Sequence, residues 1–393
     1  MSTNLRDKPI EVAAYYFPNF HADARNEALH GSGWTEWDLM KRAEVRFPGH
    51  DQPKVPAWGY DDEASPDRMA LRIDAAADHG IDTFIFDWYY YDDGPFLQRA
   101  LEDGFMQAPN NDRMRFALMW ANHNWIDIHP AKTSIQSPEG TSPMLYPGIV
   151  TEQTFDRIID LCVNKYFRHP SYWCRDGRPY FSIYELTKLM ASFGSRDNTR
   201  RCLQRFRDAV RAAGFPDLHL NAIIWNNPIL PGEKAASDPY TLVEDLGFDS
   251  AGSYTWIHHA TPHHFPVSNF QSIEEQYLQY WDRAQEESPL PYYPNLSMGW
   301  DPSPRTVQSD RYLRRGYPFT PVIGGNTPEA FRASAERIRE KLKAYNPPHP
   351  FMTINAWNEW TEGSYLEPDM KNGMAYLEAI RDIFRVSGQA LPL

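Results

Sequence analysis

Apolar runs of strand length alternate along the chain with longer segments in which apolar residues recur at helical spacing. Eight of these runs predict buried strands, because they are rich in Val, Ile, Phe, Tyr and Trp. They cover residues 12–17, 83–89, 116–121, 179–184, 218–225, 251–256, 293–299 and 351–357. Six of the intervening segments predict helices, at residues 65–80, 151–167, 200–213, 273–285, 327–345 and 374–386.

Start and stop signals support several of these helices. Ser65 and Pro66 provide an N-cap and a first-turn proline, and Gly80 provides a stop. Thr327 followed by Pro328 gives a second start of the same kind. The alternation of strands and helices is therefore the dominant pattern of the chain.

Eight strands with interleaved helices predict an α/β fold, a single (β/α)8 TIM barrel with long top-face loops. Residues 1–393 are interpreted as one catalytic domain, with residues 1–10 as an N-terminal tail. Segments 18–56 and 127–148 are too long for turns and are expected to wall an active site. The competing architecture is a doubly wound open sheet, but neither GxGxxG nor GxxxxGK[ST] occurs in the sequence.

A barrel places functional groups at the C-terminal ends of its strands, and in this chain those ends are aromatic and polar. The opposite ends are plainer, with residues such as Ile81 and Pro350. Flat aromatic faces suit stacking on sugar rings, although the same residues can simply fill a large core. The candidates for substrate binding are Tyr15, Trp34, Glu36, Asp87, Tyr89, Trp120, Asn122, His123, Trp125, Tyr184, Glu185, Trp225, Asn226, Tyr254, Trp256, His258, Trp300, Asp301, Trp357 and Asn358.

The last predicted strand leads into the segment WNEWTEG, residues 357–363, which holds two carboxylates three positions apart. In strand periodicity, even positions from 352 to 356 form an apolar face, and odd positions from 353 to 359 form a polar face directed into a cavity. Glu359 and Glu362 are therefore the candidate catalytic residues, because paired carboxylates beside aromatic rings suit acid/base work on a sugar. The alternative is a salt-bridging pair in a surface turn.

Composition narrows the class of partner. Hydrophobic residues make up 42% of the chain and charged residues 23%, which is typical of a folded globular protein. The formal net charge of -13 argues against nucleic acid and anionic membranes as partners. Aromatic residues reach 14%, with 13 Trp and 22 Tyr, which favours a carbohydrate as the substrate.

The termini and cysteines bear on location. Residues 1–9 are polar and lack the apolar core of a secretory signal, and no run of 18 apolar residues occurs. The three cysteines, Cys162, Cys174 and Cys202, are an odd number without a CxxC pair, which argues against a disulfide framework. A cytoplasmic enzyme is the expected result, with export left open if the chain has been trimmed.

Other chemistries have weaker support in the sequence, and no metal or cofactor is expected. His258, His259, His263 and His264 cluster, but Pro262 opposes a helix, so the spacing of four between His259 and His263 does not place both on one face. Neither HExxH nor GxSxG occurs, and the Asp-x-Asp typical of metal-dependent sugar transferases is absent from the sequence.

These motifs resemble those of a known group. WNEWTEG is similar to the catalytic signature of family 99 glycoside hydrolases, the endo-acting α-mannosidases and mannanases. The fuller pattern resembles the WbsX-like proteins, a related group often labelled glycosyltransferases in surface-polysaccharide gene clusters, from about residue 11 to 383. The supporting blocks are residues 33–37 (GWTEW), 116–125 (FALMWANHNW), 169–172 (HPSY), 176–179 (DGRP), 300–305 (WDPSPR) and 365–369 (YLEPD).

The resemblance implies a (β/α)8 barrel, no cofactor and two glutamates after strand eight. It also implies a retaining reaction through a 1,2-anhydro sugar, in which Glu359 assists the substrate's 2-hydroxyl and Glu362 is the acid/base. Two positions depart from the pattern. Thr361 stands where family 99 usually has His, and Asn-His-Asn around His123 replaces a commoner Asn-Glu-Asn. Both bear on sugar specificity more than on the chemistry.

The sequence therefore predicts a retaining glycoside hydrolase that acts on an α-linked polysaccharide or oligosaccharide. The alternatives are a glycosyltransferase in surface-polysaccharide biosynthesis and a non-catalytic carbohydrate-binding barrel. The sugar, the linkage, endo or exo action and the oligomeric state are not specified by the sequence.

Overall fold

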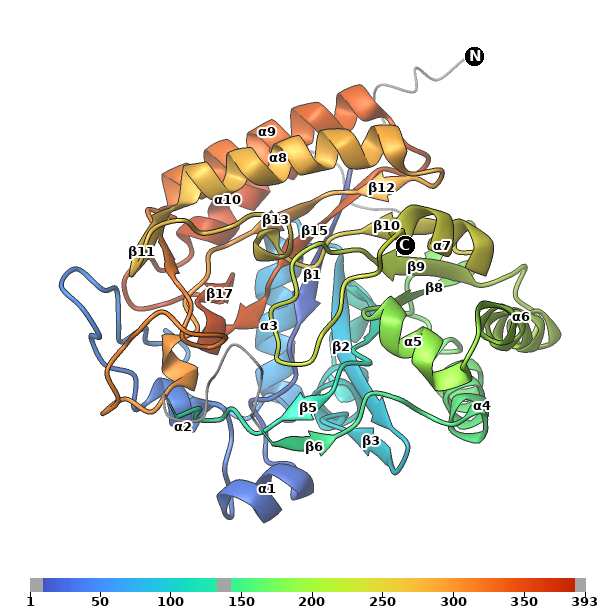
Figure 1. Ribbon diagram of the computed structural model, residues 1–393, viewed down its shortest axis with the longest axis horizontal. Coiled ribbons are helices and arrows are strands. Elements are labelled where there is room, and N and C mark those ends of the chain that lie inside the picture. The colour runs from blue at the N-terminus through green and yellow to red at the C-terminus, as the bar shows by residue number, and fades with distance from the viewer. Residues whose placement is uncertain (1–9, 133–142, 386–393) are drawn as a thin grey trace.

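A barrel of parallel strands forms the centre of the computed structural model, which describes residues 10–132 and 143–385 (Figure 1). The strands run in the order β12-β10-β9-β8-β4-β2-β1-β15-β13. In chain order their bounds are β1 Glu11–Tyr16, β2 Thr83–Tyr91, β4 Arg115–Trp120, β8 Arg178–Ile183, β9 His219–Ile223, β10 Ser250–Gly252, β12 Tyr292–Tyr293, β13 Asn295–Ser297 and β15 Phe351–Asn355.

The barrel closes through one divided strand. Pro294 separates β12 from β13, and proline lacks the N–H that a continuous ladder needs. The first half pairs with β10 and the second half pairs with β15, so the two halves together occupy the seventh strand position. The predicted (β/α)8 barrel is confirmed.

Shorter strands decorate this sheet. β3 (Gly94–Phe96) and β7 (Cys174–Arg175) extend β2 and β8 as antiparallel partners. Within residues 10–132 and 143–385, three two-stranded sheets lie outside the barrel. They pair β5 (Trp125–Ile126) with β6 (Met144–Tyr146), β11 (Val267–Asn269) with β14 (Val322–Gly324), and β16 (Asn358–Glu359) with β17 (Ser364–Tyr365).

Helices surround the barrel, with α8, α9 and α10 along one side and α4, α5 and α6 along another (Figure 1). The six predicted helices are present as α3 (Pro66–Asp78), α4 (Glu152–Leu161), α6 (Arg196–Ala212), α8 (Phe270–Glu287), α9 (Pro328–Tyr345) and α10 (Ala375–Phe384). A π-helical turn, Cys162–Tyr166, continues α4. The predicted end of the last helix at residue 386, and residues 1–9 of the predicted tail, lie outside the described residues.

Four further helices were not predicted from periodicity. They are α1 (Ala24–His30), α2 (Trp37–Met40), α5 (Leu186–Phe193) and α7 (Pro239–Leu246). Each has eight residues or fewer, so an apolar repeat has little room to show itself. The first two lie in segment 18–56, which was predicted to wall the active site but contributes no residue to the lining of the cavity.

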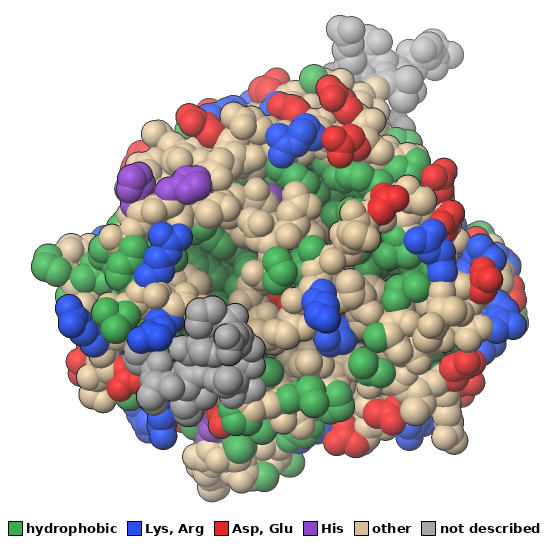
Figure 2. Space-filling model, in the orientation of Figure 1, with side chains coloured by type: hydrophobic (Ala, Val, Ile, Leu, Met, Phe, Trp, Pro, Cys, Tyr) green, Lys and Arg blue, Asp and Glu red, His purple; other side chains and the backbone are tan. Residues whose placement is uncertain are grey.

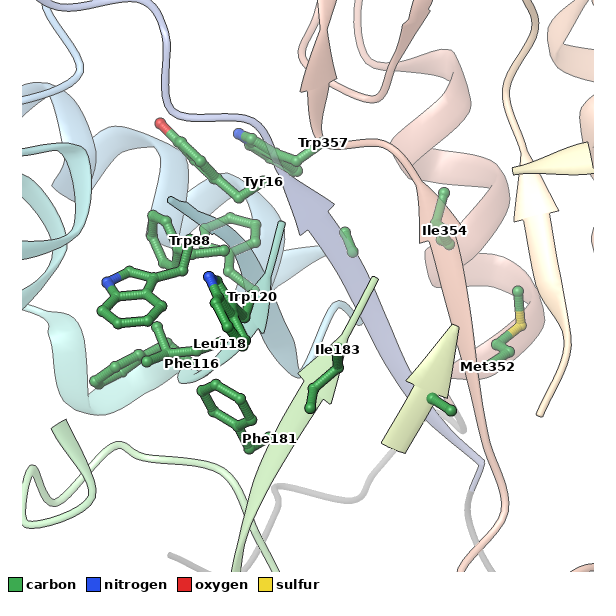
Figure 3. Packing of buried hydrophobic residues seen from close by; sticks show 14 of the residues in the cluster. Tyr16, Trp88, Phe116, Leu118, Trp120, Phe181, Ile183, Met352, Ile354 and Trp357 are labelled. Atoms are coloured by element: carbon green, nitrogen blue, oxygen red, sulfur yellow. The ribbon is translucent and has the colours of Figure 1, made fainter. Parts of the chain in front are cut away.

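Successive side chains along the strands point to opposite faces of the sheet, and this alternation produces two apolar layers. Even-numbered residues of β1, β2 and β4 pack outward against the helices, and their odd-numbered neighbours face the barrel interior. Figure 3 shows part of the outer layer, where Trp88 and Trp120 gather beside Phe181. Asp87 and Met119 consequently point inward.

The predicted polar face of residues 353–359 is only partly correct. β15 ends at Asn355, and the alternation does not continue beyond it. Trp357 packs outward with its ring centroid 5.0 Å from that of Phe84, whereas Ala356 joins the interior cluster. The chain reaches Glu359 through the short strand β16 instead.

A tight turn and a buried ion pair hold the segment after β15. Gly363 has a φ of 64°, and a Cβ at this position would lie 2.8 Å from the Cβ of Asp301, so the turn requires glycine. Glu367 accepts hydrogen bonds from the indole N–H groups of Trp357 and Trp360, at 3.1 and 2.7 Å. Arg72 of α3 lies 2.7 Å from the same carboxylate, which anchors the segment to a helix.

Among the described residues, no helix combines the length and the apolar character needed to cross a membrane.

Trp120 allows a test of this layer arrangement. Its side chain is fully buried against Phe155, so Trp120→Ala should lower the free energy of unfolding by about 3–5 kcal/mol. Chemical denaturation measures this change, with Leu29→Ala as the control because Leu29 is 44% exposed. A Trp120→Ala protein of unchanged stability would contradict the packing described.

Candidate active site

A cavity lies at the C-terminal ends of the barrel strands. Aromatic and aliphatic side chains form most of its wall, and Arg305 is the single Lys or Arg among the described residues that line it. The predicted site residues that line it are Asp87, Tyr89, His123, Trp125, Tyr184, Tyr254, His258, Trp300, Glu359 and Glu362. The structure thus brings ten of the 22 sequence candidates together in one cavity.

The two candidate catalytic carboxylates converge on one guanidinium. Arg305 Nη1 donates to Glu362 Oε1 at 2.5 Å, and Nη2 approaches Glu359 Oε2 at 3.4 Å. Tyr317 donates its hydroxyl proton to the same oxygen of Glu362 at 2.6 Å. The side chains of Glu359 and Glu362 are 6% and 9% exposed, which excludes the surface-turn interpretation of this pair.

Glu36 completes the charge balance around Arg305. Both of its carboxylate oxygens lie 3.3 Å from Arg305 Nη2, and His129 and Thr361 bond to it as well. Burial alone would raise the pKa of Glu36, but Arg305, His129 and Thr361 stabilise its anion and lower the pKa to about 2. Glu36 therefore stays ionised as the counter-ion of the guanidinium, and it lies behind the residues that line the cavity.

Glu359 and Glu362 behave in the opposite way. Burial raises the pKa of both carboxyl groups, and the nearby charge of Glu362 raises the pKa of Glu359 further, against the opposing effect of Arg305. Because Arg305 is already paired with Glu36, it compensates only part of this repulsion. The pair consequently titrates as a unit that readily keeps a proton.

Tyr254 connects Glu359 to Asp87. Its hydroxyl lies 2.8 Å from Glu359 Oε1 and 2.8 Å from Asp87 Oδ2. Burial raises the pKa of Asp87 well above its ordinary value, although the bond from Tyr254 opposes the shift. The other oxygen of Asp87 is buried without a hydrogen-bond partner in the described part of the chain.

Two neutral histidines stand on the wall. Burial lowers the pKa of His123 to about 4 and that of His258 to about 3, so both rings are uncharged at neutral pH. Tyr184 places its hydroxyl 3.2 Å from His258 Nε2. Nδ1 of His258 is buried without a hydrogen-bond partner among the described residues.

The remaining sequence candidates lie outside the cavity wall. Trp120, Trp256 and Trp357 pack in the outer core, and Tyr15 stacks behind Tyr254 with ring centroids 4.7 Å apart. Most of the others hold loops in place, and Asn226 is exposed. Asn122 bonds to the backbone of Glu185, and Glu185 lies beside Lys188. Trp225 bonds to the carbonyl of Tyr184, and Trp34 lies beside His129. Asn358 bonds to the backbone of Phe17, and Asp301 bonds to His50 and Gln52.

Sequence reasoning missed Arg305, Tyr317 and His129, which surround the carboxylates. Arg305 closes the WDPSPR block, so a signal was present, but nothing in one sequence connects that block to a distant glutamate. It also missed the aliphatic part of the wall, formed by Ile126, Ile128, Ile229 and Leu230. Ile126 lies in the two-residue strand β5 and the other three lie in loops, where apolar periodicity carries no information.

The histidine cluster does not assemble. His258 is buried and His259 is half-buried, while His263 and His264 are exposed. Across residues 10–132 and 143–385, no group of three or more His, Cys, Asp or Glu side chains is placed to hold a metal ion.

Removing Arg305 tests the charge balance. Arg305→Met leaves three buried carboxyl groups without their cation, so the unfolding free energy should fall by about 3–5 kcal/mol near neutral pH. In the wild type, the low pKa of Glu36 stabilises the folded protein at pH values above the pKa that Glu36 has in the unfolded chain. This stabilisation is lost only as the pH falls through about 2. In the variant the carboxyl pKa values rise, so the deficit should grow as the pH increases.

Urea denaturation at several pH values measures that deficit. Arg332→Met is the matched control, because Arg332 pairs with Asp382 on the surface of α9 and should change stability little. A deficit for Arg305→Met that does not change with pH would contradict the arrangement.

Solved structures share this fold at low sequence identity. The GH99 endo-alpha-mannosidase from Bacteroides thetaiotaomicron aligns over 95% of this chain and 96% of its own, with a TM-score of 0.52 and 13% identity. A structure described as a glycoside hydrolase-like protein aligns over 97% and 95%, with a TM-score of 0.59 and 17% identity. The barrel is thus of the kind found in glycoside hydrolases.

Sequence relatives are longer proteins. Uncharacterized protein WxcX from Xanthomonas campestris pv. campestris (strain B100) is 27% identical over 389 residues, which is 95% of this chain and 49% of the relative. The same protein from strain ATCC 33913 matches in the same way. The chain spans about half the length of these curated relatives. A family model described as Glycosyltransferase WbsX matches residues 12–380, and the chain therefore belongs to this family.

Proposed function

We propose that this protein is a retaining glycoside hydrolase acting on an α-linked polysaccharide or oligosaccharide, with Glu359 and Glu362 as its catalytic residues. The observation that carries the proposal is the pair of carboxyl groups on one guanidinium, inside an aromatic-lined cavity at the C-terminal ends of the strands. Both groups have raised pKa values, as acid/base residues working near neutral pH require.

The proposed reaction uses the substrate's own 2-hydroxyl. Glu359 takes the proton from this hydroxyl while its oxygen bonds to the anomeric carbon, and the glycosidic bond breaks as Glu362 protonates the leaving oxygen. Water then attacks the anomeric carbon of the 1,2-anhydro sugar and gives a proton to Glu362. The bond from that carbon to the 2-oxygen breaks, and the 2-oxygen takes back the proton held by Glu359. Two displacements at one carbon retain its configuration.

The family resemblance gives this division of roles, and the geometry shows which atoms are free to carry it out. Oε1 of Glu362 is occupied by Arg305 and Tyr317, which leaves Oε2 as the atom that can carry a transferable proton. Glu359 accepts from Tyr254, and its Oε2 lies 3.4 Å from Arg305, whereas Glu362 lies 2.5 Å from the same guanidinium. Tyr89, Trp125 and Trp300 offer rings for stacking, and the neutral imidazole of His123 can bond to a sugar hydroxyl.

The family description favours a second candidate, a glycosyltransferase of surface-polysaccharide synthesis. A sugar nucleotide would bring a diphosphate, which proteins commonly bind with free Arg or Lys side chains. Arg305 is the one such residue lining the described cavity, and it is already paired with carboxylates. On the face in Figure 2, acidic and basic side chains are interleaved instead of forming a basic patch. Calorimetry with sugar nucleotides tests this candidate, and tight binding would favour the transferase.

Amide substitution of the carboxylates tests the proposed hydrolase. After a glycan library has identified a cleaved substrate, Glu359→Gln and Glu362→Gln should each lower kcat at least about 10²–10⁴-fold while substrate binding persists. Mass spectrometry and NMR of the products report the rate and the anomeric configuration. Glu378→Gln on the exposed face of α10 serves as control, and an unimpaired Glu362→Gln enzyme would refute its assignment.

The raised pKa values of the pair predict the pH dependence. Activity needs Glu359 ionised and Glu362 protonated, so kcat/KM should be bell-shaped. Burial raises the pKa of both groups, and both limbs should therefore lie above about 4.3, the ordinary value for Glu. Initial rates across the pH range measure the profile, and an optimum at or below pH ~4 is incompatible with this account.

A further inference from the structure

The hydroxyl of Tyr254 lies between two carboxyl groups, and its single proton cannot serve both. The oxygen is 2.8 Å from Asp87 Oδ2 and 2.8 Å from Glu359 Oε1. A phenol at neutral pH has one O–H to donate, and an ionised carboxylate has none. If Asp87 and Glu359 were both ionised, one of these contacts would set a phenol lone pair against a carboxylate oxygen. One of the two carboxyl groups must therefore bring a proton.

The surroundings identify which group brings it. Glu359 has a second stabilising contact for an anion, because Arg305 Nη2 lies 3.4 Å from its other oxygen. Asp87 is 2% exposed, and its other oxygen is buried without any hydrogen-bond partner in the described residues. An unpartnered carbonyl oxygen is less costly to bury than an unpartnered charge. The proton therefore belongs to Asp87 and the negative charge to Glu359.

We propose that Asp87 is held as a neutral carboxylic acid that donates its proton to Tyr254, so that Tyr254 donates to Glu359 and keeps it ionised. Asp87 then acts as a positioning residue through Tyr254, without touching the substrate. The role in catalysis rests on the proposed function of Glu359, but the protonation of Asp87 does not.

Every group that faces this chain of hydrogen bonds agrees with the proposal. The charged or titratable groups around Asp87 are the phenols of Tyr15, Tyr89 and Tyr254 and the carboxyl groups of Glu359 and Glu362. None of these is a cation, and Glu362 repels a charge on Asp87. Burial also raises the pKa of the three phenols, so they stay neutral. Arg305, which contacts Glu359 from its other side, is also engaged by Glu36 and Glu362.

Proton uptake on folding tests the proposal in the substrate-free protein. A carboxyl group whose pKa is raised by folding contributes stability below its unfolded pKa, and this stability is lost as the pH rises. Asp87→Asn has nearly the same shape and cannot ionise. Between pH 5 and 7, the folding equilibrium constant of the wild type should therefore fall about tenfold per pH unit relative to that of Asp87→Asn.

Denaturant titrations of both proteins at each pH measure this ratio. Asp112→Asn is the matched control, because Asp112 is exposed and its replacement should leave the ratio independent of pH. A ratio for Asp87→Asn that also does not vary with pH would overturn the proposal, since it would mean that Asp87 is ionised in the folded protein.

Infrared spectroscopy gives a second measurement on the folded wild type, which remains informative if Asp87→Asn folds poorly. A protonated carboxyl group has a carbonyl band that an ionised carboxylate lacks. The band assigned to Asp87 should persist at pH 7 and disappear in Asp87→Asn. A spectrum in which no protonated-carboxyl band is lost on substitution would overturn the proposal.

The pH profile of kcat/KM separates the positioning role from a purely structural one. Tyr254→Phe removes the donor to Glu359, so the acid limb should move to higher pH. In Asp87→Asn an amide N–H replaces the acid as donor, so this limb should stay in place. A shift to lower pH in Asp87→Asn would show that a charge had been removed, and would overturn the proposal. Failure to find any hydrolysed glycan would sink the proposed function, while the folding and infrared results would still decide the state of Asp87.

Discussion

The burial of one guanidinium among several carboxyl groups governs this site. Arg305 contacts Glu36, Glu359 and Glu362, and all four side chains are almost completely removed from solvent. One positive charge cannot balance three negative ones at low dielectric. Glu36 takes the role of fixed counter-ion, with a pKa of about 2, and the other two groups share what compensation remains. Their raised pKa values follow first from burial, and the repulsion between neighbouring carboxylates adds to it.

The loops that supply these groups must be held rigidly for this balance to persist. The segment that carries both glutamates is fixed from behind by Glu367, which joins two indole N–H groups to Arg72 of α3. Asn358 binds the backbone N–H and carbonyl of Phe17 at 2.8 Å each, which ties the same segment to the end of β1. Asn358 was expected to bind a sugar, but it instead holds in place the segment that carries both glutamates.

Much of the fold could be predicted because barrel strands and long helices carry their own periodicity. All eight strand positions and six helices were identifiable, and the boundaries moved by only a few residues. The seventh strand was predicted as continuous, because the sequence does not show that the pairing partner changes from β10 to β15 at Pro294. Helices such as α2, with four residues, are too short to show a repeat. The glutamate pair was visible because both members lie in one short motif.

The sequence by itself determined which strand ends carry aromatic and polar groups, and it determined that Glu359 and Glu362 lie on one loop. It could not decide which of many tryptophans meets the cavity. Trp120 and Trp125 are five residues apart in one motif, yet the first belongs to the outer core and the second to the cavity wall. That choice depends on the side of the strand or loop from which each side chain leaves. The partners of the catalytic pair, Arg305 and Tyr317, were decided only by tertiary structure, because contacts between distant segments are set by packing and leave no local pattern in the chain.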